Sequence, residues 1–135
     1  MPEWILILTM GLPRSGKSTW ALSTGYPIVN RDAIRIALHG QAFILQAEAM
    51  VTAIEEYMVR SLFQAGHKTV IVDATHLKEK YRKRWEYGPW EIRIEKFDTS
   101  VEECIQRAKD SNREDLIPII EKMAGDIEWD NRQSQ

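Results

Sequence analysis

The sequence predicts an α/β fold with a small parallel sheet of about four strands, helices on both faces of the sheet, and a helical lid. Short apolar runs alternate with helical segments along the 135 residues. Strands that alternate with helices imply right-handed crossovers and a parallel sheet between helical layers. A glycine-rich turn follows the first run, and a later run ends in a carboxylate. We therefore expect one domain over residues 1–135, with its lid at approximately residues 107–116.

Each strand is predicted from its apolar pattern. Residues 4–9 form a continuous run rich in Ile and Leu, which is typical of a buried parallel strand. Residues 27–30 give a weaker strand signal, and residues 68–73 contain Thr-Val-Ile-Val-Asp, a second buried strand. Residues 90–97 alternate between polar and apolar side chains, which predicts a strand with one wet face at a sheet edge.

Helices are predicted between these strands from side-chain spacing and end signals. Two short helices are expected at residues 17–23 and 32–38, the second with Asp32 near its cap and His39-Gly40 at its end. The strongest helical pattern covers residues 41–65, where apolar side chains recur every three or four positions: Phe43, Ala47, Met50, Ile54, Tyr57 and Met58. The remaining helices are expected at residues 78–87, 101–108 and 116–124.

Composition limits the class of protein. The net charge is −2, so the chain as a whole is not a basic nucleic-acid binder. The charge is uneven, because residues 1–100 carry 13 basic and 11 acidic side chains and the remainder carries 5 and 9. The single cysteine, Cys104, excludes an internal disulfide and favours a reducing compartment. No run is long enough to span a bilayer and no signal peptide is evident, so we expect a cytoplasmic protein with no membrane partner.

The sharpest motif lies between the first predicted strand and helix. It has glycine, four residues, then Gly-Lys-Ser, which is the P-loop or Walker A pattern: Gly11, Leu12, Pro13, Arg14, Ser15, Gly16, Lys17 and Ser18, followed by Thr19. Backbone N–H groups in such a loop form an anion cradle at the start of a helix. The motif predicts a three-layer sandwich of the P-loop NTPase type that binds ATP, whereas a glycine-rich turn without a ligand is the alternative.

Three residues of this loop have specific expected roles. Lys17 would reach the β- and γ-phosphates, and the Ser18 hydroxyl would bind Mg²⁺. The side chain of Arg14 could lie over a phosphate or could simply be exposed to solvent.

Carboxylates after two later strands indicate a possible reaction. Asp32 and Arg35 share a helix face, and phosphoryl transfer to a hydroxyl needs a carboxylate that accepts the proton. Asp73 ends a predicted strand, where it could hold the waters around Mg²⁺, and Thr75 could orient a phosphate or Asp32. The alternative for Asp32 is that it caps a helix and forms a surface ion pair with Arg35. The alternative for Asp73 is that it only forms a turn. Asp73 could also act on Mg²⁺ only indirectly, through a water molecule.

Basic residues in two further segments could contact phosphates. Arg107 and Arg113 lie in the predicted lid, where an arginine could stabilise the transferring phosphoryl group; solvated loop charges are the alternative. A second segment combines cations with aromatic rings, which could guide a single strand: Lys78, Lys80, Tyr81, Arg82, Lys83, Arg84, Trp85, Tyr87 and Trp90. The alternative is a helix whose aromatic side chains pack on the sheet. The histidines have no metal-ligand spacing, and Cys104 is expected to be packed.

Together these stretches resemble the kinase domain of bacteriophage polynucleotide 5′-hydroxyl kinase and the wider group of small P-loop kinases, which includes zeta-toxin-like kinases. The similar stretches are residues 8–20, 30–35, 70–77 and 97–107.

The resemblance implies an ATP- and Mg²⁺-dependent kinase whose acceptor is a hydroxyl, foremost the 5′-OH of a single-stranded nucleic acid. It implies phosphate and metal roles for Lys17 and Ser18, a general-base role for Asp32, an acceptor-side role for Arg35 and a lid role for Arg107. A second lid arginine is usual one helical turn later, but this chain has Ser111 there, so Lys109 or Arg113 could take that role.

Two departures from the family pattern bear on function. The family loop commonly has glycine at the position of Arg14. No phosphatase domain is evident, so repair of 3′ ends is not expected. A kinase for a small metabolite or nucleotide sugar, and a nucleotide-binding NTPase without an acceptor, remain alternatives.

Overall fold

A computed structural model describes residues 3–41 and 43–131. Its four strands form one parallel sheet in the order β2-β3-β1-β4. The strands are β1 (Ile5–Gly11), β2 (Ile28–Asn30), β3 (Thr69–Asp73) and β4 (Glu91–Phe97). The predicted sheet is confirmed, and β4 lies at its edge as expected.

Within the described residues, six α-helices and three short 3₁₀ segments connect and extend the strands. The α-helices are α1 (Lys17–Thr24), α2 (Arg31–His39), α3 (Glu48–Gln64), α4 (Glu79–Lys83), α5 (Val101–Asp110) and α6 (Ile117–Ala124). The 3₁₀ segments are η1 (Leu45–Ala47), η2 (Arg84–Tyr87) and η3 (Glu114–Leu116). No described helix has both the length and the apolar character needed to cross a membrane.

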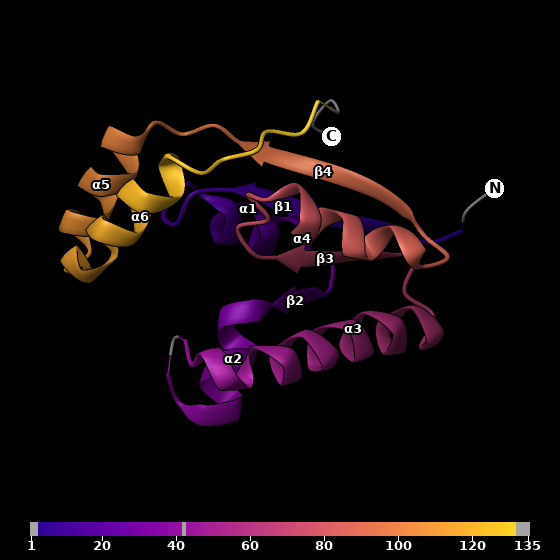
Figure 1. Ribbon diagram of the computed structural model, residues 1–135. Helices are drawn as coiled ribbons and strands as arrows, with labels where there is room; N and C mark the ends of the chain where they lie inside the picture. The colour runs from indigo at the N-terminus through magenta and orange to yellow at the C-terminus, as the bar shows by residue number, and fades with distance from the viewer. Residues whose placement is uncertain (1–2, 42, 132–135) are drawn as a thin grey trace.

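Alternate side chains of the central strands bury opposite faces of the sheet. Ile7 and Ile71 pack with Ala21 of α1 on one face. Leu6 and Leu8 belong to the larger core on the other face, which includes Phe63 of α3. Figure 1 shows α5 and α6 at the end of the sheet to which the strand arrows point. The site at the carboxyl ends of the strands therefore lies between the sheet and these two helices.

The helix predicted over residues 41–65 is shorter in the structure than expected, and the face that it buries is not the predicted one. An α-helix is present only over Glu48–Gln64, preceded by η1; residue 42 lies outside the described part of the chain. Phe43, Met50 and Tyr57 of the expected stripe are exposed. The stripe that packs on the core is Val51, Glu55, Val59 and Phe63. A buried glutamate interrupts this stripe, which explains why the apolar pattern indicated another face.

Two smaller differences lie elsewhere. The expected helix at residues 78–87 is divided into α4 and η2. The predicted lid at residues 107–116 is mostly helical, because Arg107 lies in the last turn of α5 and only residues 111–113 separate this helix from η3. Cys104 is buried on α5, as predicted.

Candidate active site

The loop of residues 11–18, called here the phosphate loop, requires glycine at two positions. Gly16 has φ +106°, a conformation that side chains rarely adopt. A Cβ atom on Gly11 would lie 2.7 Å from Ser15 Oγ and 2.9 Å from Phe97 Cβ. Thr99 Oγ1 donates to the Ser15 carbonyl at 2.8 Å and ties the loop to the end of β4. The loop is therefore packed against the end of β4, where a side chain at position 11 would clash.

Lys17 places a buried ammonium group inside this loop. Its Nζ atom donates to the Leu12 carbonyl at 2.7 Å, and the residue is only 8% exposed. Burial lowers the pKa of Lys17 to about 8, while the carboxylates of Asp73 and Asp32 act in the opposite direction. Burial disfavours the charged form of Lys17, and the negative charge of a bound phosphate would stabilise that form.

The lowered pKa predicts a pH dependence of nucleotide binding. Below pH 8 the Lys17 ammonium group is charged, and above pH 8 it loses its proton in the free protein. A bound phosphate favours the protonated form, so binding weakens as the pH rises. We expect the Kd for ATP to be constant near pH 7 and to rise about fivefold between pH 8 and pH 9. Titration with a fluorescent ATP analogue measures this. Lys17→Arg keeps its charge over this range, so a slope as steep as that of the wild type in this variant would contradict the assignment.

Asp73 connects three elements at the strand ends. Its Oδ2 atom accepts hydrogen bonds from Ser18 Oγ at 2.8 Å and Asn30 Nδ2 at 3.0 Å, and its Oδ1 accepts from Thr9 Oγ1 at 3.2 Å. Asn30 is the register partner of Asp73 across β2 and β3. The roles of Thr9 and Asn30 were not predicted, although both lie at strand ends beside the motif residues.

The donor set at this point fits Mg²⁺. The Ser18 hydroxyl and the Asp73 carboxylate are hard oxygen ligands, and Mg²⁺ keeps several waters while it binds one or two protein ligands and substrate phosphates. Over residues 3–41 and 43–131, no group of three or more His, Cys, Asp or Glu side chains could hold a metal. A metal at Ser18 and Asp73 would therefore take its remaining ligands from water and from the phosphates.

Asp32 lies near the start of α2 but does not cap it. The N-cap is Asn30, whose Oδ1 atom accepts the Ala33 N–H at 2.8 Å, so the alternative that Asp32 caps the helix is excluded. The Asp32 side chain is 78% exposed, and its only ion pair among the described residues is with Arg35 Nη1 at 2.7 Å. Because Asn30 supplies the cap, the Asp32 carboxylate remains largely exposed beside Arg35.

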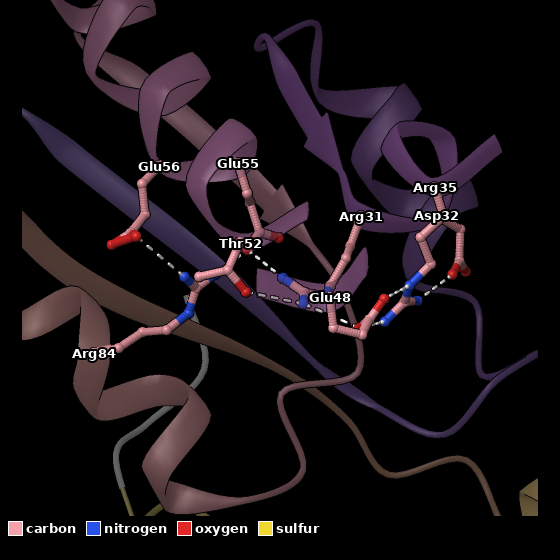
Figure 2. Close-up of polar contacts among 8 residues, drawn as sticks. All are labelled: Arg31, Asp32, Arg35, Glu48, Thr52, Glu55, Glu56 and Arg84. Carbon is pink, nitrogen blue, oxygen red and sulfur yellow. Dashed lines mark hydrogen bonds and ion pairs between the residues drawn. The ribbon is translucent and has the colours of Figure 1, made fainter. Parts of the chain in front are cut away.

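A chain of ion pairs extends from Asp32 into the interior (Figure 2). Arg35 donates to Glu48 through Nε at 2.9 Å and Nη2 at 2.6 Å. Arg31 contacts Glu48 at 3.1 Å and Glu55 at 2.9 Å, and Arg84 of η2 also binds Glu55. The guanidinium of Arg35 is thus fixed between Asp32 and Glu48. Glu48 and Glu55 were not predicted; Glu55 continues the spacing of four from Val51 to Val59, but its burial depends on arginines far away in the sequence.

Glu55 should be the most sensitive residue of this chain for stability. It is fully buried and binds two arginines, so Glu55→Ala leaves their charges without a partner. We expect the free energy of unfolding to fall by about 3 kcal/mol, measured by urea denaturation. Glu56→Ala is the matched control, because Glu56 is exposed and has a single contact with Arg84 at 3.7 Å. Equal losses in the two variants would contradict this role.

The structure brings the predicted lid arginine, Arg107, to the phosphate loop, whereas Arg113 pairs with Asp115. Arg107 Nη1 donates to the Arg14 carbonyl at 3.2 Å. Arg113 is exposed and pairs with Asp115 through contacts of 3.0 and 3.2 Å. This hydrogen bonding raises the pKa of Arg113. Lys109 also lies on α5.

The basic and aromatic segment divides into a buried and an exposed part. Trp85 and Trp90 pack in the core, as the packing alternative predicted, whereas Tyr81 and Tyr87 are exposed. Arg82 is buried and donates to the carbonyls of His76 at 2.7 Å and Glu128 at 2.6 Å. Arg84 is bound to Glu55, so three of the five cations of this segment remain near the surface. These three, Lys78, Lys80 and Lys83, line a hollow together with Glu79 and Glu128.

The loop after β3 carries Thr75, a predicted acceptor-side residue. Its carbonyl accepts the Gly11 N–H at 3.1 Å, so it lies beside the start of the phosphate loop. The next residue, His76, is buried and hydrogen-bonds through Nδ1 to the Thr9 carbonyl at 2.7 Å. Burial lowers the pKa of His76 to about 4, so the ring is neutral near pH 7 and acts as a donor in this contact.

Comparison with known proteins agrees with this geometry. A family model described as an AAA domain, AAA_33, matches residues 6–120, which is most of the chain. The chain belongs to this family. The match includes the phosphate loop, Asp32, Asp73 and Arg107.

Solved structures with the same fold include several kinases. A chain of the Pnkp1/Rnl/Hen1 complex is 28% identical over 79% of this chain, with a TM-score of 0.71. A gluconokinase from Sinorhizobium meliloti is 22% identical, covers 95% of this chain and 76% of its own length, and has a TM-score of 0.61. The Mycobacterium tuberculosis APS kinase CysC, solved with AMPPNP and APS, is 18% identical over 98% of this chain and 86% of its own, with a TM-score of 0.67.

These matches confirm the expected fold class and the resemblance to small P-loop kinases. The chain spans 40% of the matched Pnkp1/Rnl/Hen1 chain and 47% of a second chain from that RNA repair complex. The chain thus has a P-loop kinase-type fold and corresponds to less than half of each of these two chains.

Proposed function

We propose that this chain transfers the γ-phosphoryl group of ATP to the 5′-hydroxyl of a polynucleotide, with Mg²⁺ as cofactor. The observation that carries this proposal is the position of Asp32. Its exposed carboxylate lies at the start of α2, directly after β2 and two residues beyond Asn30, the register partner of Asp73, and it is held by an arginine that two further hydrogen bonds fix to Glu48. A fixed carboxylate opposite a phosphate loop is what phosphoryl transfer to an alcohol requires.

The proposed mechanism assigns the proton to Asp32. The acceptor oxygen bonds to the γ-phosphorus while the bond from that phosphorus to the β–γ bridging oxygen breaks, and Asp32 takes the hydroxyl proton. Arg35 orients Asp32 through its contact of 2.7 Å and faces the acceptor side. Lys17 and Arg107 bind the charge on the phosphates. Residues 11–19 hold the triphosphate, and Ser18 with Asp73 would hold Mg²⁺, which supplies charge neutralisation at the phosphates.

Two observations support a nucleic-acid acceptor. The chain of 28% identity belongs to the Pnkp1/Rnl/Hen1 complex, and a second matched chain comes from a structure described as an RNA repair complex. In addition, the exposed side chains of Lys80 and Lys83 and the partly buried Lys78 form a local group of cations near the exposed ring of Tyr81, with Glu79 and Glu128 in the same hollow. Cations bind phosphates and aromatic rings stack on bases, so this surface suits a single strand.

A phosphoryl-transfer assay tests the acceptor. Labelled ATP is offered with 5′-hydroxyl DNA, 5′-hydroxyl RNA, the same oligonucleotides already 5′-phosphorylated, and a panel of sugars and small alcohols. We expect label only on the 5′-hydroxyl strands, and a higher KM for them with Lys80→Glu. Label on a sugar alone would indicate a metabolite kinase, and ATP hydrolysis independent of every acceptor would indicate a simple NTPase. Arg84→Glu is unsuitable as a surface variant, because Arg84 binds buried Glu55.

A further inference from the structure

Arg14 links the phosphate loop to the end of α5. Its Nη2 atom donates a hydrogen bond to Ser111 Oγ, directly after α5. Ser111 Oγ also lies 2.8 Å from the Arg107 carbonyl, and Arg107 Nη1 donates to the Arg14 carbonyl at 3.2 Å. Three hydrogen bonds thus join two arginines and one serine between the loop and the end of α5.

The fold itself does not require an arginine at this position. Arg14 has φ +68°, in the left-handed region where glycine is the favoured residue. The residue is exposed, so its side chain fills no part of the core. The local backbone would therefore tolerate glycine at least as well, and the contribution of Arg14 has to come from its side chain.

The partner of the Arg14 side chain is weak compared with a phosphate. Ser111 offers a neutral hydroxyl on the surface, whereas a phosphoryl oxygen is anionic and makes charge-assisted hydrogen bonds that are about twice as strong. Arg113 is already bound by the carboxylate of Asp115. Arg14 belongs to the phosphate loop itself, and its hydrogen-bond partner is a neutral hydroxyl. Its guanidinium can therefore leave Ser111 and bind an anionic phosphoryl oxygen instead.

We propose that Arg14 is a catalytic residue that moves its guanidinium from Ser111 to the transferring phosphoryl group, and that Ser111 is the positioning residue that holds it beside the loop. This proposal rests on the proposed function. Arg14 forms no covalent bond: its N–H groups leave the serine and donate to oxygens of the phosphoryl group while the bond from phosphorus to the bridging oxygen breaks. Together with Arg107, it gives the transition state two guanidinium groups.

Arg14→Gly provides the test, because glycine suits the backbone at φ +68°. We expect kcat for transfer to fall by about 100-fold or more, with an unchanged or higher Tm. The affinity for ADP should change less than about threefold, whereas the affinity for ADP with magnesium and aluminium fluoride, which imitates the transferring group, should fall by about 30-fold or more. Ser111→Ala removes a hydrogen bond that exists only before transfer, so it should raise kcat by about threefold to tenfold and leave the affinity for ADP unchanged.

Each outcome decides between this role and another. An Arg14→Gly variant with wild-type kcat and wild-type affinity for the aluminium fluoride complex would show that Arg14 is only an exposed loop residue. Equal losses of affinity for ADP and for the aluminium fluoride complex would show a ground-state phosphate contact, which also overturns the proposal. If the wild-type protein transfers phosphate to no acceptor, the proposed function fails, and the aluminium fluoride comparison still decides the role of Arg14.

Discussion

Asp32→Asn should lower kcat for transfer to a 5′-hydroxyl by about 10²- to 10⁴-fold. The amide cannot accept the hydroxyl proton, but its oxygen can still accept the hydrogen bond from Arg35 that Asp32 Oδ1 accepts now at 2.7 Å. The helix start should also remain intact, because Asn30 caps it. We therefore expect the Kd for ATP and the Tm to stay within the error of the wild-type values. Steady-state kinetics with labelled ATP, together with nucleotide titration, measure both effects.

Asp126→Asn is the matched control for this variant. Asp126 is an exposed aspartate beyond α6, so the same loss of a carboxylate there should leave kcat unchanged. If Asp32→Asn kept wild-type turnover, Asp32 would not be the base. A parallel loss of ATP affinity would instead assign Asp32 to nucleotide binding.

Lys17→Met should weaken ATP binding by about 10- to 100-fold. A hydrogen bond to a charged group contributes about 1.5–3 kcal/mol, and 1.4 kcal/mol corresponds to a factor of ten in affinity. Methionine approximates the length of lysine and removes only the ammonium group. The pKa of Lys17 is lowered to about 8 by burial, so its charged form opposes folding at neutral pH, and this penalty decreases as the pH rises above 8. We therefore expect a Tm at pH 7 equal to or above that of the wild type, measured by thermal melting beside the nucleotide titration.

The combination of a stable fold and lost affinity separates a binding role from misfolding. Lys122→Met on α6 serves as the control, because Lys122 lies outside the phosphate loop, and its replacement should leave the Kd for ATP unchanged. Wild-type ATP affinity in Lys17→Met would contradict the role of the phosphate loop as the nucleotide site.

The fold and the phosphate loop could be predicted from local pattern alone. The buried run of β1, the glycines at positions 11 and 16 and the strand that ends at Asp73 are signals that neighbouring residues create, so no tertiary contact is needed to recognise them. The structure confirms these elements and brings Lys17, Ser18 and Asp73 together.

The features that could not be predicted depend on contacts between distant segments. Glu55 looks like a polar interruption of α3, and only Arg31 and Arg84, 24 and 29 residues away, make its burial favourable. The apolar stripe of α3 was therefore assigned to the wrong face. Arg84 looked like a surface cation for the same reason. The contact of Arg14 with Ser111 spans 97 residues and leaves no local signal.

A structure with a non-hydrolysable ATP analogue, Mg²⁺ and a 5′-hydroxyl oligonucleotide tests the central claim most directly. The account predicts the triphosphate within residues 11–18 and an Asp32 oxygen within hydrogen-bonding distance, about 2.6–3.2 Å, of the 5′-hydroxyl. That hydroxyl should lie in line with the bond that breaks at the γ-phosphorus. A bound strand whose 5′ end lies away from Asp32, with the carboxylate still facing only Arg35, would contradict it.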